Sequence, residues 1–147
     1  MDDYGHHPTA ITTTLEGLRA FYPERRLIVS FMSHTYTRTE ALLKEFATAF
    51  GAADMVVLHK IYASAREQYK GGVNGKTLYE KMKKNRDQVF YIEEVMDAQD
   101  FLKQTLRSGD IFLTLGAGDN WLLGIELLEY YKNQHPKGNG DYSIKET

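Results

Sequence analysis

The apolar residues near the start of the chain recur at the spacing of one helical face. They are separated by four, three and three positions, at Ile11, Leu15, Leu18 and Phe21. Such spacing is typical of an amphipathic helix that packs one side against a core. Pro8 suits the first helical position, where its missing N–H costs no hydrogen bond, and Pro23 ends the helix. The pattern therefore predicts a helix over residues 8–22.

Four short, apolar runs alternate with further helical patterns. The runs predict strands at residues 27–31, 55–58, 88–92 and 111–115. Helical patterns cover residues 42–50, 76–85 and 98–107 and the segment after residue 119. Thr37 and Glu40 have the spacing of a capping box before the first of these helices, and Gly51 follows it. The basic run Lys81, Lys83, Lys84 and Arg86 is interpreted as a solvated helix face.

Strands separated by helical crossovers predict one α/β domain, with a mostly parallel sheet and helices on both faces. We expect the domain to cover residues 1–133 and residues 134–147 to form a flexible tail. Ligands of such sheets bind outside the carboxyl ends of the strands. That rule selects residues 33–39, 59–75, 93–97 and 116–120. The long segment 60–75, which contains Tyr62 and Tyr69, is expected to be the least ordered internal part of the chain.

Composition and charge exclude several classes of protein. The 147 residues have a formal net charge of −2, so the basic excess that nucleic-acid binding needs is absent. There is no Cys, which excludes a disulfide scaffold and a thiol nucleophile. No apolar run is long enough to span a membrane, and the polar start Met1-Asp2-Asp3-Tyr4 is not a signal peptide. We expect a cytoplasmic protein without nucleic-acid or membrane partners.

The first candidate cluster is Asp3-Tyr4-Gly5-His6-His7-Pro8, which concentrates two imidazoles, a carboxylate and a phenol before a helix. Adjacent histidines point in different directions and chelate a metal poorly, so a simple metal site is disfavoured. The alternative is that His7 stands beside a helix cap and His6 is a solvated loop residue.

The second cluster is Ser33-His34-Thr35-Tyr36-Thr37-Arg38-Thr39, which leaves a strand and enters a helix. A guanidinium grips a carboxylate with two hydrogen bonds, so Arg38 is a candidate for anion recognition. The alternative is a surface arginine on a capped helix. The third cluster, Gly116-Ala117-Gly118-Asp119, has Trp121 where a dinucleotide fingerprint needs glycine. We interpret it as a tight turn with Asp119 capping the last helix.

Three blocks of sequence resemble the C-terminal domain of the Mur ligases. They are the opening Asp2-Asp3-Tyr4-Gly5-His6-His7-Pro8-Thr9, the run from Phe31 that ends in His34-Thr35-Tyr36-Thr37-Arg38-Thr39, and Gly116-Ala117-Gly118-Asp119. They span nearly the whole chain in the family's order. The resemblance implies a Rossmann-like sheet and is closest to the members that join L-alanine to UDP-N-acetylmuramate with ATP and Mg²⁺. Their first two domains, which bind the UDP-sugar and carry the phosphate-binding loop, are not in this sequence.

The resemblance also implies roles for individual residues. Asp3, Tyr4 and His6 would lie on the nucleotide side, and His34, Tyr36, Arg38 and Tyr62 on the L-alanine and UDP-sugar side. Thr35 stands where the family usually has Arg, and residues 64–69 differ from the family's acidic, proline-containing loop.

Because the chain contains no complete Walker A sequence (Gly-x-x-x-x-Gly-Lys-Ser/Thr), we expect it to be inactive alone and to hold no ATP or Mg²⁺. Two other hypotheses stay open. One is a stand-alone module that binds a small anion or regulates another protein; a Gly-Lys-Thr/Ser loop encoded upstream would exclude it. The other is a metallohydrolase that uses His6, His34 and Asp3.

Overall fold

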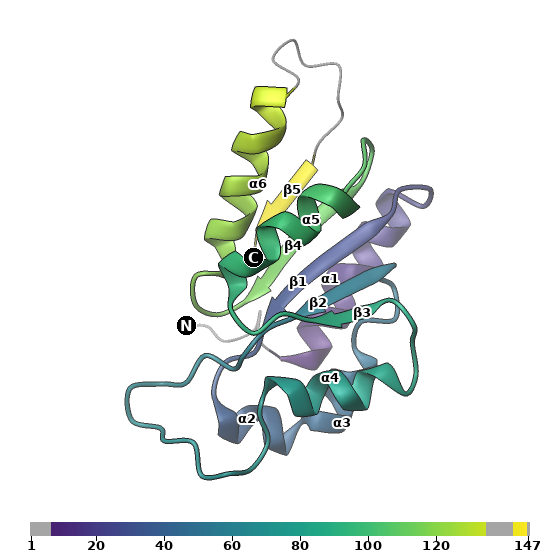
Figure 1. The fold of residues 1–147 in the computed structure, drawn as a ribbon. Coiled ribbons are helices and arrows are strands. Elements are labelled where there is room, and N and C mark those ends of the chain that lie inside the picture. The colour runs from purple at the N-terminus through teal and green to yellow at the C-terminus, as the bar shows by residue number, and fades with distance from the viewer. Residues whose placement is uncertain (1–6, 135–142, 147) are drawn as a thin grey trace.

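The computed structural model describes residues 7–134 and 143–146. Helices and strands alternate along the chain (Figure 1), in the order α1 (Pro8–Phe21), β1 (Leu27–Met32), α2 (Tyr36–Ala41), α3 (Leu43–Thr48), β2 (Met55–Leu58), α4 (Gly75–Lys83), β3 (Val89–Tyr91), a 3₁₀ helix (Val95–Ala98), α5 (Gln99–Thr105), β4 (Ile111–Gly116), α6 (Asn120–Gln134) and β5 (Ser143–Glu146). Within these residues, no helix is long and apolar enough to cross a membrane.

The five strands form one parallel sheet in the order β3-β2-β1-β4-β5. The chain therefore builds outward from β1 to β3 and then returns to add β4 on the other side of β1. β1 and β4 pair from Leu27 beside Ile111 to Met32 beside Gly116. The expected α/β class and parallel sheet are confirmed. The order changes direction between β1 and β4, and sheets of this kind bind ligands outside the carboxyl ends of the strands at that point.

The edge strand β5 is not in the sequence prediction. It pairs in parallel with β4, with Ser143 beside Ile111 and Glu146 beside Thr114. The flexible tail expected over residues 134–147 therefore does not extend over residues 143–146. This stretch has a single strongly apolar residue, Ile144, so its periodicity is too short to mark a strand.

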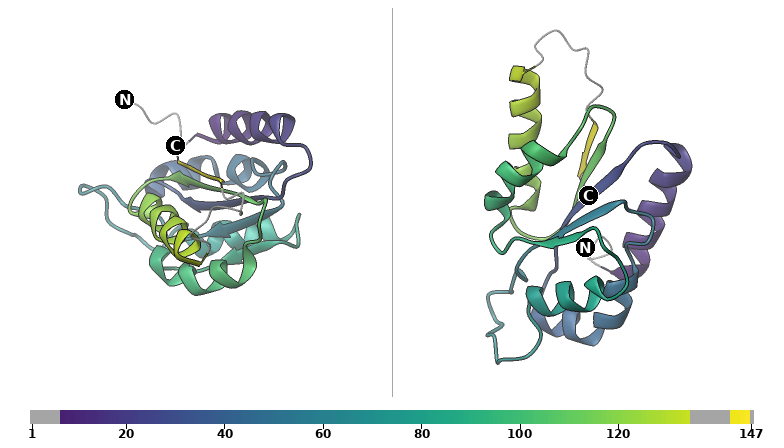
Figure 2. Two further views of the ribbon diagram at one scale, coloured as in Figure 1. Left: turned by 90° about the horizontal axis from the view of Figure 1, so that it is seen from above. Right: turned by 45° about the vertical axis from the view of Figure 1, so that its right-hand side comes forward.

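Each face of the sheet has its own apolar core, because successive strand residues point to opposite faces. Leu27, Val29 and Phe31 of β1 belong to the core that α1, α3 and α4 cover. Ile28 and Met32 belong to the core covered by the 3₁₀ helix, α5 and α6. Figure 2 shows the sheet between these two helical layers. Burial on both faces explains why the strands have continuous apolar runs instead of alternation.

The helix expected over residues 42–50 corresponds to α3, and a separate short helix, α2, precedes it. α2 ends at Ala41 and α3 starts at Leu43, and Leu42 adopts φ −117° and ψ 22° between them. α2 begins before Thr37, with Thr35 as its N-cap residue. The expected capping box of Thr37 and Glu40 is therefore wrong.

Arg86 does not lie on a solvated helix face, because α4 ends at Lys83. Its guanidinium donates hydrogen bonds to the carbonyls of Phe50 and Ala53, and burial lowers its pKa below the ordinary value. The arginine thus ties the end of α4 to the turn after α3.

Candidate functional site

The turn between β1 and α2 is held in an unusual backbone conformation. In the described part of the chain, Thr35 is the non-glycine residue with a positive φ, at 65°. Its carbonyl accepts a hydrogen bond from the Thr39 hydroxyl (2.7 Å), which accepts one from the buried hydroxyl of Ser33. Such strain costs on the order of 1–3 kcal/mol and persists only where the surroundings hold it. The turn that leads into α2 is therefore fixed from within.

The carboxylate of Glu67 covers the N-terminus of α2. Glu67 Oε2 accepts from the backbone N–H of Tyr36 at 2.9 Å, and Oε1 accepts from the N–H and the hydroxyl of Thr37, both at 2.8 Å. Partial burial raises the pKa of this carboxyl, but the hydrogen bonds from Thr37 and Tyr36 outweigh it and hold the pKa below the ordinary value. This loop residue takes the place of the expected capping box.

The loop after β2 starts by pairing with the residues that follow β1. Thr35 N–H donates to the Tyr62 carbonyl at 2.9 Å, and Tyr62 N–H donates to the Ser33 carbonyl at 2.8 Å. This parallel bridge brings the rings of His34 and Tyr62 together, with centroids 6.0 Å apart and planes inclined by 25°. Two of the predicted site residues therefore lie side by side.

The glycine turn after β4 packs against the same place. Gly116 and Gly118 have φ values of 98° and 69°. A Cβ on Gly116 would lie 2.0 Å from the Met32 carbonyl oxygen, and one on Gly118 would lie 2.8 Å from Tyr62 Cδ2. Ala117 N–H also donates to the Met32 carbonyl at 2.9 Å. Close backbone approach explains both glycines, in agreement with the tight turn that the sequence predicts.

A chain of buried polar side chains crosses the sheet beneath this edge. Asn120 Nδ2 donates to the carbonyls of Ser30 (2.8 Å) and Leu115 (2.7 Å), which fixes the orientation of the amide. Asn120 Oδ1 lies 2.7 Å from Ser30 Oγ, which lies 2.6 Å from His59 Nε2. His59 Nδ1 lies 2.7 Å from the carbonyl oxygen of Ile92. This network of hydrogen bonds thus connects β1 with the residues that follow β2, β3 and β4.

The buried side chains of this network have few hydrogens to donate to one another. Burial lowers the pKa of His59 to about 4, so the ring is neutral at neutral pH. With its hydrogen on Nδ1, bonded to the Ile92 carbonyl, the ring offers Nε2 as an acceptor. Ser30 has one hydroxyl hydrogen, so it can donate to either His59 or Asn120 at one time. Sequence reasoning did not identify this chain, and the one signal was Ser30 inside an apolar run.

The predicted substrate-side residues follow the carboxyl ends of β1 and β2, but they do not form one cluster. His34 and Tyr62 stack on each other, whereas the Tyr36 ring packs against Tyr69, with centroids 5.0 Å apart. Arg38 is half-buried on α2, and its backbone N–H donates to the Thr35 side chain at 3.2 Å. The predicted nucleotide-side residues Asp3, Tyr4 and His6 lie outside the described residues.

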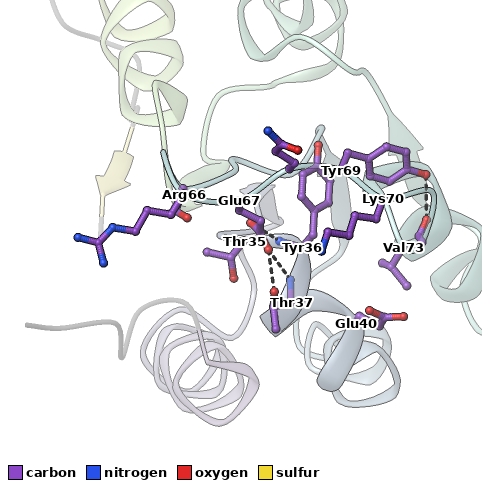
Figure 3. Close-up of a pocket in the computed structure, with 12 residues that line it drawn as sticks. Thr35, Tyr36, Thr37, Glu40, Arg66, Glu67, Tyr69, Lys70 and Val73 are labelled. Atoms are coloured by element: carbon purple, nitrogen blue, oxygen red, sulfur yellow. Dashed lines mark hydrogen bonds between the residues drawn. The ribbon is translucent and has the colours of Figure 1, made fainter.

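An open cavity of about 620 Å³ separates α2 from the loop after β2 (Figure 3). Tyr36, Thr37 and Glu40 line one side, and residues of the loop line the other. His34, Arg38 and Tyr62 are not part of its lining. In Figure 3, Glu67 reaches across to α2 and Arg66 points away from the cavity.

The described residues supply no metal site. Within residues 7–134 and 143–146, no three His, Asp or Glu side chains come together as a metal site requires. His34 stacks on Tyr62, and the other two residues of the metallohydrolase hypothesis, Asp3 and His6, lie outside this part.

Known proteins resemble this chain over most of its length. A relative in Treponema pallidum (strain Nichols), a UDP-N-acetylmuramate–L-alanine ligase, is 60% identical over 91% of the chain and 28% of its own length. The ligases of the same name in Borreliella burgdorferi and Desulfitobacterium hafniense are 42% and 44% identical over 84% and 87% of the chain. These matches cover 26% and 28% of those relatives. The chain thus spans little more than a quarter of the curated relatives it matches.

Solved structures agree in fold. A UDP-N-acetylmuramate–alanine ligase from Thermotoga maritima matches 90% of this chain and 26% of its own, with a TM-score of 0.70 at 22% sequence identity. A domain from a related ligase of Haemophilus ducreyi matches 85% of this chain and 84% of its own, with a TM-score of 0.56. The family model described as Mur ligase, glutamate ligase domain, matches residues 1–118. The chain belongs to the Mur ligase family.

Proposed function

We propose that this chain is the C-terminal domain of an ATP-dependent ligase that joins L-alanine to UDP-N-acetylmuramate. The observation that carries the proposal is the 60% identity to the Treponema pallidum ligase of that name over 91% of the chain. The relative is more than three times longer than the matched part, so the reaction belongs to the complete protein. The missing N-terminal and central domains are the macromolecular partners of this chain.

The reaction forms an amide bond in two steps. The γ-phosphoryl group of ATP passes to the carboxylate of UDP-N-acetylmuramate, giving an acyl phosphate and ADP. The amine of L-alanine then attacks the acyl carbon, the C–O bond to phosphate breaks, and phosphate and the amide product leave. Mg²⁺ would offset negative charge during phosphoryl transfer, and its ligands are assigned to the other domains.

The residues of this chain bind and orient the substrates in this proposal. Arg38 takes the L-alanine carboxylate in a two-bond fork, and His34, Tyr36 and Tyr62 surround the amino acid. Their support is position, since all four follow the carboxyl ends of β1 and β2 beside the point where the strand order changes direction. Asp3, Tyr4 and His6 are assigned to the nucleotide on the ground of the family resemblance alone.

The test is turnover by the complete protein. Steady-state release of ADP over many turnovers should require UDP-N-acetylmuramate and L-alanine together, and glycine or L-serine should replace L-alanine poorly. The coding sequence upstream should contain a Gly-Lys-Thr/Ser loop. ADP release that is indifferent to L-alanine, or the absence of the upstream loop, would refute the proposal in favour of a stand-alone anion-binding module.

A further inference from the structure

Between residues 62 and 72, the loop that joins β2 to α4 contacts the β1–α2 turn and α2 at three points. Near its start, Tyr62 forms the backbone bridge with residues 33–35. Near its end, the ring of Tyr69 packs against Tyr36, and its hydroxyl donates to the Gly72 carbonyl at 2.9 Å. Glu67 is the middle attachment. The cavity lies between the loop and α2, so Glu67 spans the space that separates them (Figure 3).

The chemistry of the Glu67 contact makes it stronger than its exposure suggests. The first N–H groups of a helix have no acceptor within the helix. Glu67 satisfies two of them, at Tyr36 and Thr37, and also accepts from the Thr37 hydroxyl. Hydrogen bonds to a carboxylate are roughly twice as strong as those between neutral groups. Because Glu67 is only half-buried, water can compete with the contact, and the attachment is reversible.

We propose that Glu67 is a positioning residue, whose carboxylate latches the loop onto α2 and thereby holds Tyr36 and Tyr62 in place for the amino-acid substrate. The inference rests on the proposed function, which puts both tyrosines around L-alanine. Glu67 itself does not touch the substrate. Glu67 fixes the distance between the loop and α2. When the loop is detached from α2, it has to close again before the amino-acid substrate can bind.

The latch can be tested on this chain by hydrogen exchange resolved by NMR. Glu67→Ala should speed the exchange of the Tyr36 and Thr37 amides about tenfold or more, because both lose their acceptor. Exchange of the Val29 amide in the central strand should not change. The matched control is Glu45→Ala, which removes an exposed carboxylate from the first turn of α3. Unchanged exchange at Tyr36 and Thr37 in the Glu67→Ala variant overturns the latch.

The positioning role is tested in the complete ligase. If Glu67→Ala leaves the loop closed in about one molecule of ten, the KM for L-alanine rises about tenfold. The KM values for ATP and UDP-N-acetylmuramate should stay within about twofold. Glu67→Gln should have an intermediate effect, because its amide oxygen accepts a hydrogen bond but carries no charge, and Glu45→Ala should have none.

Each adverse outcome refutes a different statement. An equal rise of all three KM values, or a fall in kcat alone, shows a general structural role and overturns the positioning role. An unchanged KM for L-alanine does the same. A complete protein without L-alanine-dependent turnover overturns the proposed function, and amide exchange at Tyr36 and Thr37 still decides whether Glu67 is a latch.

Discussion

At the scale of single residues, Arg38 makes the most specific prediction about binding. If Arg38 takes the L-alanine carboxylate as proposed, its replacement by Ala in the complete protein removes a charge-assisted pair worth roughly 1.5–3 kcal/mol. The KM for L-alanine should rise about tenfold or more, with little change for UDP-N-acetylmuramate. Arg38→Lys should restore binding only in part, because an ammonium group cannot form the two-bond fork.

Arg107 offers a matched control for Arg38. It is exposed and lies just before β4, at the opposite end of the sheet from the candidate site. Arg107→Ala should leave the KM for L-alanine unchanged. If Arg38→Ala behaves like this control in steady-state assays, Arg38 does not bind the carboxylate.

Ser30 tests the buried polar chain through stability. Ser30→Ala leaves His59 Nε2 and Asn120 Oδ1 without their shared hydroxyl, in surroundings that water does not reach. The free energy of unfolding should fall by roughly 1–3 kcal/mol in urea denaturation. Thr114→Val is the control. Thr114 is buried beside Ser30 on β4, but its hydroxyl does not take part in the hydrogen bonds that join Asn120, Ser30 and His59. An equal fall in the free energy of unfolding of the two variants would mean that the hydrogen bonds of Ser30 do not contribute specifically to stability.

His59 predicts how stability depends on pH. Its pKa is about 4 in the folded protein against an ordinary value of 6.5, so the unfolded chain binds more protons between these two values. Stability should therefore fall as the pH drops from 6.5 to 4, by on the order of 3 kcal/mol over the whole window. Urea denaturation at several pH values should give a flatter dependence for His59→Gln, which cannot titrate. Parallel curves for the two proteins would refute the assignment.

At the scale of elements, the turn between β4 and α6 depends on glycine for two separable reasons. Gly116 combines a φ of 98° with contact against the Met32 backbone, whereas Gly109 has a φ of 92° in open space. Gly17 lies in α1 with nothing near its Cβ position. Gly109 therefore reports on backbone strain alone, Gly116 on strain together with close contact, and Gly17 on helix propensity.

Alanine substitutions at these glycines should give a graded series in urea denaturation. Gly109→Ala should cost about 1–2 kcal/mol from backbone strain alone. Gly116→Ala should cost more than about 3 kcal/mol, since the methyl group also collides with a carbonyl that cannot move freely. Gly17→Ala should stabilise the protein by roughly 0.5–1 kcal/mol. Equal effects at positions 109 and 116 would show that the contact with Met32 is not important.

The sequence predicts the elements that owe their pattern to burial. β1 and β4 are apolar throughout because helices cover both faces of the sheet, and α1 is marked by Ile11 and Leu15 on its buried face. β5 is too short to show a period. The break at Leu42 depends on packing that local periodicity does not contain.

The candidate site could be predicted less fully, because its contacts join distant parts of the chain. His34 and Tyr62 lie together since each follows the carboxyl end of a neighbouring strand, which the topology rule anticipates. Glu67 reaches a helix 31 positions earlier, and Ser30 meets Asn120 across 90 positions. No local pattern marks either pair. The assigned roles of Asp3, Tyr4 and His6 rest on resemblance and stay predictions.

At the scale of the whole molecule, the fold separates stability from chemistry. Two apolar cores lie on opposite faces of a five-stranded sheet, which gives the chain the interior of an independent domain. The candidate site lies at the carboxyl ends of the strands and consists of turns and a loop. Within the described residues, the carboxyl ends of the strands are surrounded by hydrogen-bond donors, by aromatic rings and by a half-buried arginine on α2.

The last prediction is that this chain folds by itself but does not turn over ATP. Phosphoryl transfer needs backbone amides and a cation that together neutralise the triphosphate. The sequence has no complete Gly-x-x-x-x-Gly-Lys-Ser/Thr loop, because Gly75-Lys76-Thr77 has Lys70 at the position of the first glycine. The turn at Gly116 and Gly118 cannot replace it, because it packs against Met32 and Tyr62 and is followed by Asp119, which repels phosphate. Calorimetry should find ATP binding in the millimolar range or none, and phosphate release should equal the buffer blank. Circular dichroism with a cooperative thermal transition would show that the sample is folded. ATP turnover by such a sample, retained through successive purification steps, would mean that the catalytic centre lies in this chain and not in the domains that precede it.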